Sequence, residues 1–527
     1  MNKKVPVFDT ETLAGIRRGI EKESLRVSPS GVLSSKCHPA KLGSALTHPS
    51  ITTDFSESQL ELITQTHSSV EDCIRELTQI HKTVYENIED ELLWCSSMPC
   101  DLPREEAIPI GIYGASNIGR AKHVYRRGLS HRYGRKMQMI SGIHYNFSIP
   151  ENAWQILQKD VYSGESIEEL RNHFYFALIR NFQREAWLLL YLFGGSPAVC
   201  KTFTEKKVHR LKNFKSGDMY LPEATSLRMG PLGYQSDVQS SIAVTYNTLN
   251  SYTRSLQAAL TEPYPPYAYI GIKNGDSYNQ LSTSLLQIEN EFYSTIRPKR
   301  RIKPSERPLH ALHNRGVEYV EIRAIDLDPY SELGISEDTI RFIDIFLLHC
   351  LLTDSPADSP KELVDIHHNQ HVVAEYGRDP HTKIFRGDNL QTIKEWGTEI
   401  IEKCFPIATA LDSANQTDKY SASLEIASRI IRNPENSISA KVLKDICNYH
   451  DQSFKNFTLH NSKKHKEKFK KLEYPSNIVN KDKGIAQKSL FRQRELEVES
   501  KTDFESYRKS YIDQTSSLEK SLKNMDG

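Results

Sequence analysis

A glutamate and an arginine two residues apart, in the segment 317–327, have the types and spacing to act together on a bound phosphate. The segment reads VEYVEIRAIDL and alternates apolar with polar side chains, which is typical of a half-buried strand. In such a strand Glu321 and Arg323 project from the exposed face, while Val320 and Ile322 point to the core. A carboxylate beside a guanidinium can hold a metal ion next to a phosphate. With the segments described next, this arrangement suggests an ATP-dependent enzyme.

Other strand-like segments carry acidic or imidazole side chains in the same pattern. The segment 20–27 has two glutamates on one face, and the segments 53–63 and 143–149 add two more acids and a histidine. One sheet could therefore present five acids and an imidazole, namely Glu21, Glu23, Asp54, Glu61, Glu321 and His144.

The chemistry of this set favours a hard cation. Oxygen ligands with a single histidine suit Mg²⁺, or Mn²⁺, better than structural zinc. Carboxylates at such density repel one another, and bound cations are the natural compensation. Taken singly, an alternating glutamate is more often part of a solvated strand face, and Glu289 and Glu291 are left out of the metal set for that reason.

Basic side chains supply the complement to an anionic substrate. A planar guanidinium fork suits a carboxylate or phosphate better than an ammonium does. The candidates are Arg228, Arg297, Lys299 and Arg323. For Arg297 and Lys299, a solvated basic loop is as good an interpretation as contact with an anionic substrate. For Arg323, the position beside Glu321 favours contact with the substrate.

Composition excludes several classes of protein. The 527 residues include 68 basic and 67 acidic side chains, so a global attraction to nucleic acid or membrane is not indicated. The N-terminus lacks the apolar run of a signal peptide, and the longest apolar block, 186–193, is far too short to cross a bilayer. Eight cysteines occur without a CxxC spacing. We therefore expect a cytoplasmic protein with reduced thiols.

The order of predicted elements favours an α+β fold with a largely antiparallel sheet. Helices are predicted at 70–92, at 164–193 after the capping pattern 166–169, at 336–352 and at 389–413. Strands are predicted at 268–272, 285–293 and 317–327. Strands and helices mix without a regular βαβ alternation, and neither a GxxxxGK[ST] loop nor a GxGxxG turn is present.

The C-terminal part of the chain has a different composition. The segment 460–471 is rich in lysine, and 487–527 is polar, charged and poor in aromatic residues. We expect a catalytic domain over 1–455, followed by a charged, helical or partly disordered extension over 456–527 that does not build a packed core of its own.

Seven segments of the chain resemble those of the bacterial glutamate–cysteine ligase (γ-glutamylcysteine synthetase) family and occur in the family's order. They cover most of residues 10–355 and are GIEKESLRV, LGSALTHPSITTDFSESQLELIT, YGASNIGR, ISGIHYNFS, YLPEATSLRMGPLGY, LQIENEFYSTIRPKR and GVEYVEIRAIDLDP. The likeness is weaker over 360–455, and no resemblance is apparent beyond 455. The resemblance implies a glutamine synthetase-like fold, in which a curved, largely antiparallel sheet forms a funnel with helices packed outside.

The resemblance also implies roles for individual residues. Its metal ligands fall on the six acidic and histidine positions named above. Arg323 matches the phosphate-contacting arginine and Arg228 the glutamate-binding arginine, and the cysteine pocket corresponds to Phe55, Tyr125, Leu129, Tyr234 and Tyr293. We expect Arg297, Lys299 and Arg323 to contact the nucleotide, and Glu321 and Arg323 to be the catalytic pair.

The implied activity is ATP-dependent ligation of the γ-carboxylate of L-glutamate to the amine of L-cysteine, the first step of glutathione biosynthesis. Mg²⁺ is the expected metal, ATP the co-substrate, and glutathione a possible feedback inhibitor. Two alternatives remain open. One is a ligase of the same fold with a different amine acceptor, and the other is a ligand-binding regulator that has lost turnover, against which the intact acidic set argues.

Overall fold

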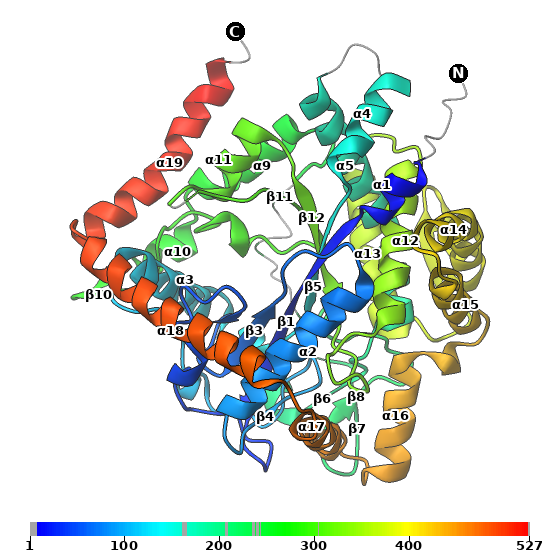
Figure 1. Ribbon diagram of the computed structural model, residues 1–527, viewed down its shortest axis with the longest axis horizontal. Helices are drawn as coiled ribbons and strands as arrows, with labels where there is room; N and C mark the ends of the chain where they lie inside the picture. The colour runs from blue at the N-terminus through cyan, green and yellow to red at the C-terminus, as the bar shows by residue number, and fades with distance from the viewer. Residues whose placement is uncertain are drawn as a thin grey trace.

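An antiparallel sheet lies at the centre of the protein and carries helices on its outer side (Figure 1). The computed structural model describes residues 8–160, 166–205, 209–233, 238, 242, 244–303 and 305–524. The strand order is β11-β12-β5-β1-β3-β2, with β4 paired to one end of β1, and these pairs are antiparallel. The seven strands are β1 (Arg17–Val27), β2 (Ile51–Thr53), β3 (Gln59–Ile63), β4 (Leu92–Leu93), β5 (Ile143–Ser148), β11 (Ile296–Lys299) and β12 (Tyr319–Ile325).

The apolar face of this sheet and the helices share one hydrophobic core. Ile20, Tyr145, Phe147 and Ile322 are almost completely buried, because alternate residues of each strand point to the helix layer. The helices up to the C-terminal region are α1 (Thr10–Ala14), α2 (Val70–Asn87), α3 (Asn117–Tyr133), α4 (Glu151–Asp160), α5 (Ile167–Glu185), α6 (Trp187–Phe193), α7 (Lys201–Thr204), α9 (Leu249–Thr261), α10 (Pro265–Ile270), α11 (Pro308–Arg315), α12 (Glu337–Leu352), α13 (Pro360–Tyr376), α14 (Ile393–Asn415), α15 (Lys419–Arg432) and α16 (Ile438–Tyr449).

Three small sheets and three C-terminal helices complete the described structure. In the small sheets, β8 (Met219–Tyr220) pairs with both β6 (Ala198–Val199) and β7 (Lys212–Asn213), β9 (Lys273–Asn274) pairs with β10 (Ser277–Tyr278), and β13 (Lys383–Arg386) pairs with β14 (Asn389–Thr392). The last helices are α17 (Phe454–Lys470), α18 (Ser476–Glu499) and α19 (Phe504–Asn524). Within the described residues, no helix is long and apolar enough to span a membrane.

The predicted α+β class with an antiparallel sheet is confirmed, and so are several of its elements. The segment 317–327 contains strand β12, and the helix expected over 336–352 is α12. The helix expected over 70–92 is α2, which ends earlier, at Asn87. The long helix expected over 164–193 begins with the capping box at Ser166 but divides into α5 and α6 at Ala186; residues 164 and 165 lie outside the described ranges.

Two predicted elements are wrong, and a third begins later than predicted. The segment 268–272 belongs mostly to helix α10, because Pro265 and Pro266 occupy the first helical positions, where the missing N–H costs nothing. The segment 285–293 contains one 3₁₀ turn, whose two glutamates pair with the buried Arg307 and Arg132 instead of alternating along a strand. Residues 389–392 form strand β14, and the helix starts only at Ile393, after a capping box.

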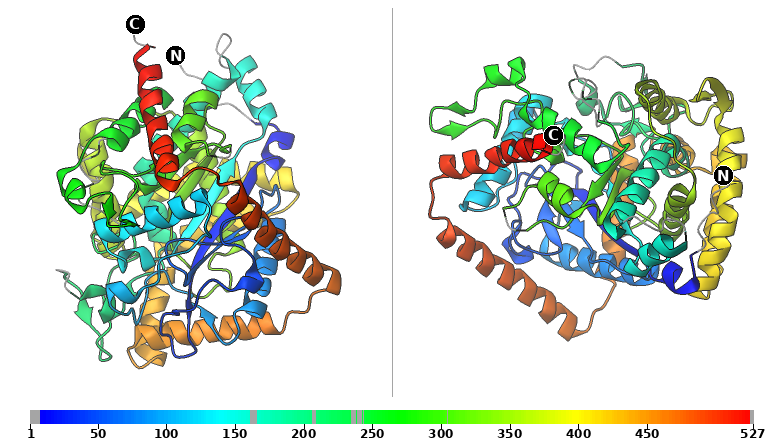
Figure 2. Two further views of the ribbon diagram at one scale, coloured as in Figure 1. Left: turned by 90° about the vertical axis from the view of Figure 1, so that its left-hand side faces the viewer. Right: turned by 90° about the horizontal axis from the view of Figure 1, so that it is seen from above.

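The C-terminal helices pack against the rest of the protein, which the composition of this segment did not predict. Phe454 and Phe457 of α17 belong to the core beneath β4, and Phe469 joins the main core. Figures 1 and 2 show α18 running along the outside of the molecule from α17, and α19 rising along its edge, where it contacts α9 and α3. The boundary at 455 between a domain and an extension stays a prediction.

A buried ion pair joins the central strand to the helix layer. The Nε of Arg18, on β1, lies 2.9 Å from the Oδ2 of Asp344, on α12. Tyr145, on β5, donates from its hydroxyl to the Oδ1 of the same carboxylate at 2.7 Å. Arg18 also donates to the carbonyls of His67 and Ser68. Because these charged groups are almost fully buried, each needs all of its partners.

We expect Asp344→Ala to destabilise the protein by about 3–5 kcal/mol, because the charge of Arg18 would stay buried without its carboxylate. Urea unfolding followed by circular dichroism measures the loss. The control is Asp388→Ala, whose side chain is 94% exposed and which should change stability by less than about 0.5 kcal/mol. Equal stability of the two variants would contradict the importance of the pair.

Candidate active site

The acidic residues expected to bind metal come together on the sheet face opposite the helix layer, which we call the acid face. Glu21 on β1 lies directly across from His144 on β5, and Glu23 lies across from Glu61 on β3. Glu321 on β12 lies across from Asn146 on β5. Cross-strand partners in an antiparallel pair project from the same face, so four strands contribute to one site. The acid face consists of Glu21, Glu23, Glu61, Glu321, His144 and Asn146.

His144 is at the centre of the acid face. Its Nδ1 lies 3.2 Å from the Oε2 of Glu21 and 3.7 Å from the Oε1 of Glu321. Its Nε2 lies 3.5 Å from the Oε1 of Glu23. One ligand atom each from Glu21, Glu61 and His144 lies within 4.8 Å of the other two, a spacing at which a single cation could contact all three.

Electrostatics show how crowded the carboxylates are. Burial raises the pKa of Glu61 well above its ordinary value, and the charges of Glu21 and Asp54 raise it further. Burial also raises the pKa of Glu23. For Glu21, burial acts in the same direction, but the hydrogen bond and charge of His144 help to outweigh it, so that its pKa is lowered. Asp54 is therefore close enough to act on the cluster, although it lies after β2.

Hydrogen bonds to the backbone N–H and carbonyl of Asp54 fix its position. Its N–H donates to the carbonyl of Gln59 at 3.0 Å, and its carbonyl accepts from the hydroxyl of Tyr113 at 2.7 Å. The guanidinium of Arg126 donates to the same carbonyl. The turn that carries Asp54 is thus held by α3 and by the segment before it.

Glu321 is the carboxylate with cationic neighbours. The Nζ of Lys299 lies 3.3 Å from its Oε2, and the guanidinium of Arg323 lies 3.2 Å from its Oε1. Burial would raise the pKa of Glu321, but these two positive charges hold it well below its ordinary range. Arg323 also lies 3.4 Å from the Nδ1 of His144. Glu321, Lys299 and Arg323 therefore form one charged group at the edge of the acid face.

The other two arginines predicted for the site, Arg228 and Arg297, donate hydrogen bonds to backbone carbonyls of the protein. Arg228 donates to the carbonyl of Arg323 at 2.8 Å and lies 3.6 Å from Asp326. A Cβ on Gly142 would lie 2.2 Å from the guanidinium of Arg228, so a larger residue there would displace this guanidinium. Arg297 shares the face of Glu321, but its guanidinium donates to the carbonyls of Asn290 and Phe292.

The residues predicted to surround the cysteine substrate lie in one cluster, as far as the structure describes them. Phe55 and Leu129 are buried in it, and Tyr125 and Tyr293 pack against its edge. The hydroxyl of Tyr293 accepts a hydrogen bond from Gln138 at 3.1 Å. Tyr234 lies outside the described residues.

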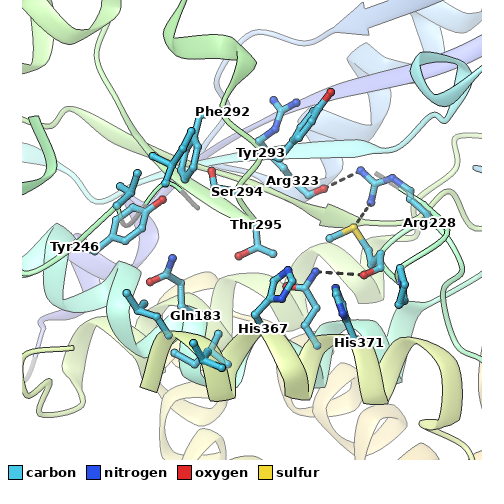
Figure 3. A pocket seen from close by; sticks show the side chains of 18 of the residues that line it. Gln183, Arg228, Tyr246, Phe292, Tyr293, Ser294, Thr295, Arg323, His367 and His371 are labelled. Atoms are coloured by element: carbon cyan, nitrogen blue, oxygen red, sulfur yellow. Dashed lines mark hydrogen bonds between the residues drawn. The ribbon is translucent and has the colours of Figure 1, made fainter. Parts of the chain in front are cut away.

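A cavity of about 780 Å³ opens beside the acid face. Glu23, His144, Arg228 and Arg323 are among the residues that line it. Figure 3 shows side chains of α5 and α13 on the side opposite the two arginines. The cavity is large enough for small-molecule substrates and is lined in part by charged groups.

The family model for glutamate–cysteine ligase matches residues 7–373, which include every residue of the acid face. The chain belongs to the glutamate–cysteine ligase family.

Relatives within the family match nearly the whole chain. The glutamate–cysteine ligase of Saccharophagus degradans is 44% identical over 517 residues, which is 97% of this chain and 96% of the relative. The glutamate–cysteine ligase of Alcanivorax borkumensis is 43% identical over 506 residues, which is 95% of this chain and 96% of the relative. A match to 97% of the chain extends into the C-terminal helices, where the sequence alone showed no resemblance.

Solved structures agree with this assignment. The crystal structure of glutamate–cysteine ligase from Francisella tularensis in complex with AMP has a TM-score of 0.90 and 36% identity, covering 95% of this chain and 98% of that chain. A bifunctional glutathione synthetase from Pasteurella multocida has a TM-score of 0.66 and 25% identity, covering 87% of this chain and 52% of that chain.

The motifs of the ligase family did not point to the far wall of the cavity. That wall includes Gln183 on α5, Tyr246, and His367, Gln370 and His371 on α13. His367 and His371 are four residues apart on one helical face, with ring centroids 4.1 Å apart. The spacing HHNQH was a usable signal for a helix that presents two imidazoles together.

We expect Glu61→Gln to raise the melting temperature of the metal-free ligase at pH 8. The pKa of Glu61 is raised in the folded state, so its favourable contribution is present at low pH and lost as the pH rises above the ordinary value of 4.5. At pH 8 this carboxyl group therefore opposes folding, and glutamine, which cannot ionise, removes that cost.

The same variant should lose most of the thermal shift produced by Mg²⁺ together with nucleotide. Glu467→Gln, on the exposed side of α17, is the control and should change neither quantity. A melting temperature of Glu61→Gln that falls at pH 8 would contradict the repulsion inferred for the acid face.

Proposed function

We propose that the acid face and the adjoining cavity join the γ-carboxylate of L-glutamate to the amine of L-cysteine, with hydrolysis of ATP to ADP and phosphate. The product is γ-glutamylcysteine, and the reaction is the first step of glutathione biosynthesis, as family membership implies. The observation that carries the proposal is the group formed by Glu321, Lys299 and Arg323 beside the acid face, because it places candidate cation ligands next to two positively charged side chains.

ATP is needed because an oxide ion is a poor leaving group. Transfer of the γ-phosphoryl group to the glutamate γ-carboxylate gives an acyl phosphate, and the cysteine amine then displaces phosphate through a tetrahedral state. Arg323 would stabilise the negative charge during both steps, and so would Lys299, whose Nζ lies 3.3 Å from the Oε2 of Glu321. No protein nucleophile is required by this route.

The acid face suits Mg²⁺, with Mn²⁺ as a second candidate. The Oδ1 of Asn146 is buried and accepts no hydrogen bond from the part of the chain that the structure describes, and the Oε2 of Glu321 is buried beside the ammonium group of Lys299 at 3.3 Å. Buried carboxylate and amide oxygens beside a single imidazole match the ligands that hard divalent cations prefer. We assign the metal to Glu21, Glu23, Asp54, Glu61, His144 and Glu321. When bound, the metal neutralises charge on the phosphates of ATP.

Substrate contacts follow from the same geometry. We assign Arg228 to glutamate, since it lines the cavity and is held by the carbonyl of Arg323. Phe55, Tyr125, Leu129 and Tyr293 would surround the cysteine side chain, together with Tyr234. Of the predicted nucleotide contacts, Lys299 and Arg323 face Glu321, whereas Arg297 would first have to release its two backbone carbonyls.

Two further parts of the proposal concern the cellular location of the enzyme and its inhibition by glutathione. Near-balanced charge and cysteines without disulfides fit a cytoplasmic protein. Glutathione, which contains the product's γ-glutamylcysteine unit, is proposed to act as a feedback inhibitor at this site.

Phosphate release with glutamate, ATP, Mg²⁺ and a panel of amines tests the function. Cysteine should be the best acceptor, and 2-aminobutyrate should follow within about 1–3 kcal/mol, because an apolar pocket discriminates weakly at this scale. Preference for an unrelated amine would favour the alternative acceptor, and binding without phosphate release would favour a regulator.

Glu321→Ala should lower kcat by a factor of about 10²–10³ in this assay, since it removes a charged group that acts on the transition state. The matched control is Glu318→Ala, three residues earlier, whose carboxylate pairs with the exposed Arg301. If Glu321→Ala kept at least about half of the wild-type turnover, its assignment as a ligand and catalytic group would fail.

A further inference from the structure

A second cluster of metal-ligating side chains lies outside the acid face. The sulfur atoms of Cys100 and Cys200 and a carboxylate oxygen of Asp101 all lie within 4.8 Å of one another. Both cysteines are buried, with 3% and 2% of their surface exposed, and both are free thiols. Asp101 is only partly buried and provides the side open to solvent.

The surroundings of this thiol cluster, Cys100, Asp101 and Cys200, fix its orientation. The ammonium group of Lys455 on α17 contacts the Oδ2 of Asp101, which leaves Oδ1 directed toward the sulfur of Cys200 at 3.9 Å. The N–H of Asp101 and the hydroxyl of Thr202 donate to the same sulfur, at 3.4 and 3.5 Å. Such donors favour the thiolate form of Cys200.

We propose that the thiol cluster binds a thiophilic divalent cation of the Zn²⁺ class. Two thiolates and a carboxylate with one open position form a ligand set that prefers zinc-like ions to Mg²⁺. Lys455 would hold the carboxylate in place as a partner outside the ligand set. The ion would join the loop after β4 to the start of α7, and through Lys455 to α17.

Titration with Co²⁺ tests this site, because cobalt bound to thiolate shows charge-transfer absorption in the near ultraviolet. The full chain is used without added thiols and with saturating Mg²⁺ to occupy the acid face. One equivalent of thiolate-bound Co²⁺ is expected, lost in Cys100→Ser and in Cys200→Ser and retained in Cys37→Ser, an exposed cysteine.

Absence of the absorption band from the wild-type protein would overturn the proposal, and this outcome does not depend on whether a variant folds. Asp101→Asn provides a second test, since it keeps both sulfurs and removes one charged ligand. It should weaken Co²⁺ binding by about 10–100-fold. Unchanged affinity of Asp101→Asn for Co²⁺ would show that the carboxylate of Asp101 is not a ligand.

An independent inference concerns α18 and α19, which pack against the segments leading to the predicted cysteine pocket (Figures 1 and 2). Ser44 donates from its N–H to the hydroxyl of Ser489 at 2.9 Å, and Thr47 donates from its hydroxyl to the carbonyl of Ser489 at 2.5 Å. Gly43 has φ +85°, and a Cβ there would lie 2.4 Å from the Ser489 hydroxyl. The close approach of α18 therefore requires glycine.

The end of α18 holds the start of α3. Glu497 accepts from the N–H of Ala115 at 2.9 Å, and Ser500 accepts from the N–H of Asn117 at 3.1 Å. The side-chain amide of Asn117 donates to the carbonyl of Thr502 at 2.9 Å. These bonds satisfy N–H groups at and before the first turn of α3, which have no partner within the helix.

The first residue of α19 continues this contact. Phe504 is buried in a cluster with Ala121 and Val124 of α3. Tyr125 packs against that cluster and also against the cluster that contains Phe55 and Leu129. One turn of α3 thus connects Phe504 to the residues assigned to the cysteine side chain.

We infer that α18 and α19 position α3 for binding of the amine substrate, with Phe504 and Asn117 as positioning residues. This inference rests on the proposed function, because it takes Tyr125 and Leu129 as part of the cysteine pocket. Glutamate is assigned to Arg228, which is not on α3, so the two substrates should respond differently.

Steady-state kinetics of Phe504→Ala in the full chain test this role. The KM for cysteine should rise about tenfold while kcat and the KM for glutamate stay within about twofold, since a small displacement of a pocket wall acts on one substrate. Phe504→Leu should restore most of the loss. Phe491→Ala, at an exposed position of α18, is the matched control.

Equal changes in both KM values, or no change, would overturn the positioning role. Asn117→Ala supplies the same comparison if Phe504→Ala does not fold. Failure of the proposed function is distinguishable, because in that case the wild-type enzyme itself would not release phosphate with glutamate and cysteine.

Discussion

Repulsion among carboxylates on one face of a sheet is the constraint on which the rest of this structure depends. Glu21, Glu23, Glu61 and Glu321 surround His144, and the pKa of Glu61 is raised by burial and by its neighbours' charges. Such a face stays folded only if the strands beneath it are held firmly from the other side. Any cation that binds this face would add stability, so the repulsion that opposes folding is proposed also to favour metal binding.

The opposite face of β1 shows how the strand is held. Arg18 pairs with Asp344, Arg26 pairs with Glu91, and the Nζ of Lys22 lies 2.8 Å from the Nε2 of His81. Burial lowers the pKa of Lys22 to about 7. Each of these side chains meets its partner inside the protein, whereas Glu61 of the acid face lies among other acids whose charges raise its pKa. The contrast separates the groups that maintain the fold from the groups that await a ligand.

Substrate selection is proposed to come from elements at the edge of the sheet. Arg228, Arg323 and side chains of helices α5 and α13 line the same cavity, so charge recognition and shape recognition would come from different parts of the chain. The cysteine pocket is proposed to depend on α3, which is itself held by α18 and α19. In this proposal, the long C-terminal helices affect substrate binding at a site to which they contribute no residue.

The sequence by itself determined the α+β class, the strand β12 and the helix α12, and the faces on which the acidic residues project, because periods of two and of 3.6 residues are local properties. It also identified the capping box of α5. It misassigned 285–293, because Glu289 and Glu291 take their places from the distant arginines Arg307 and Arg132. Only the tertiary structure decided which strands are neighbours, that the guanidinium of Arg297 binds backbone carbonyls, and that the C-terminal helices reach α3. These outcomes depend on contacts between residues far apart in the chain, which no local pattern encodes.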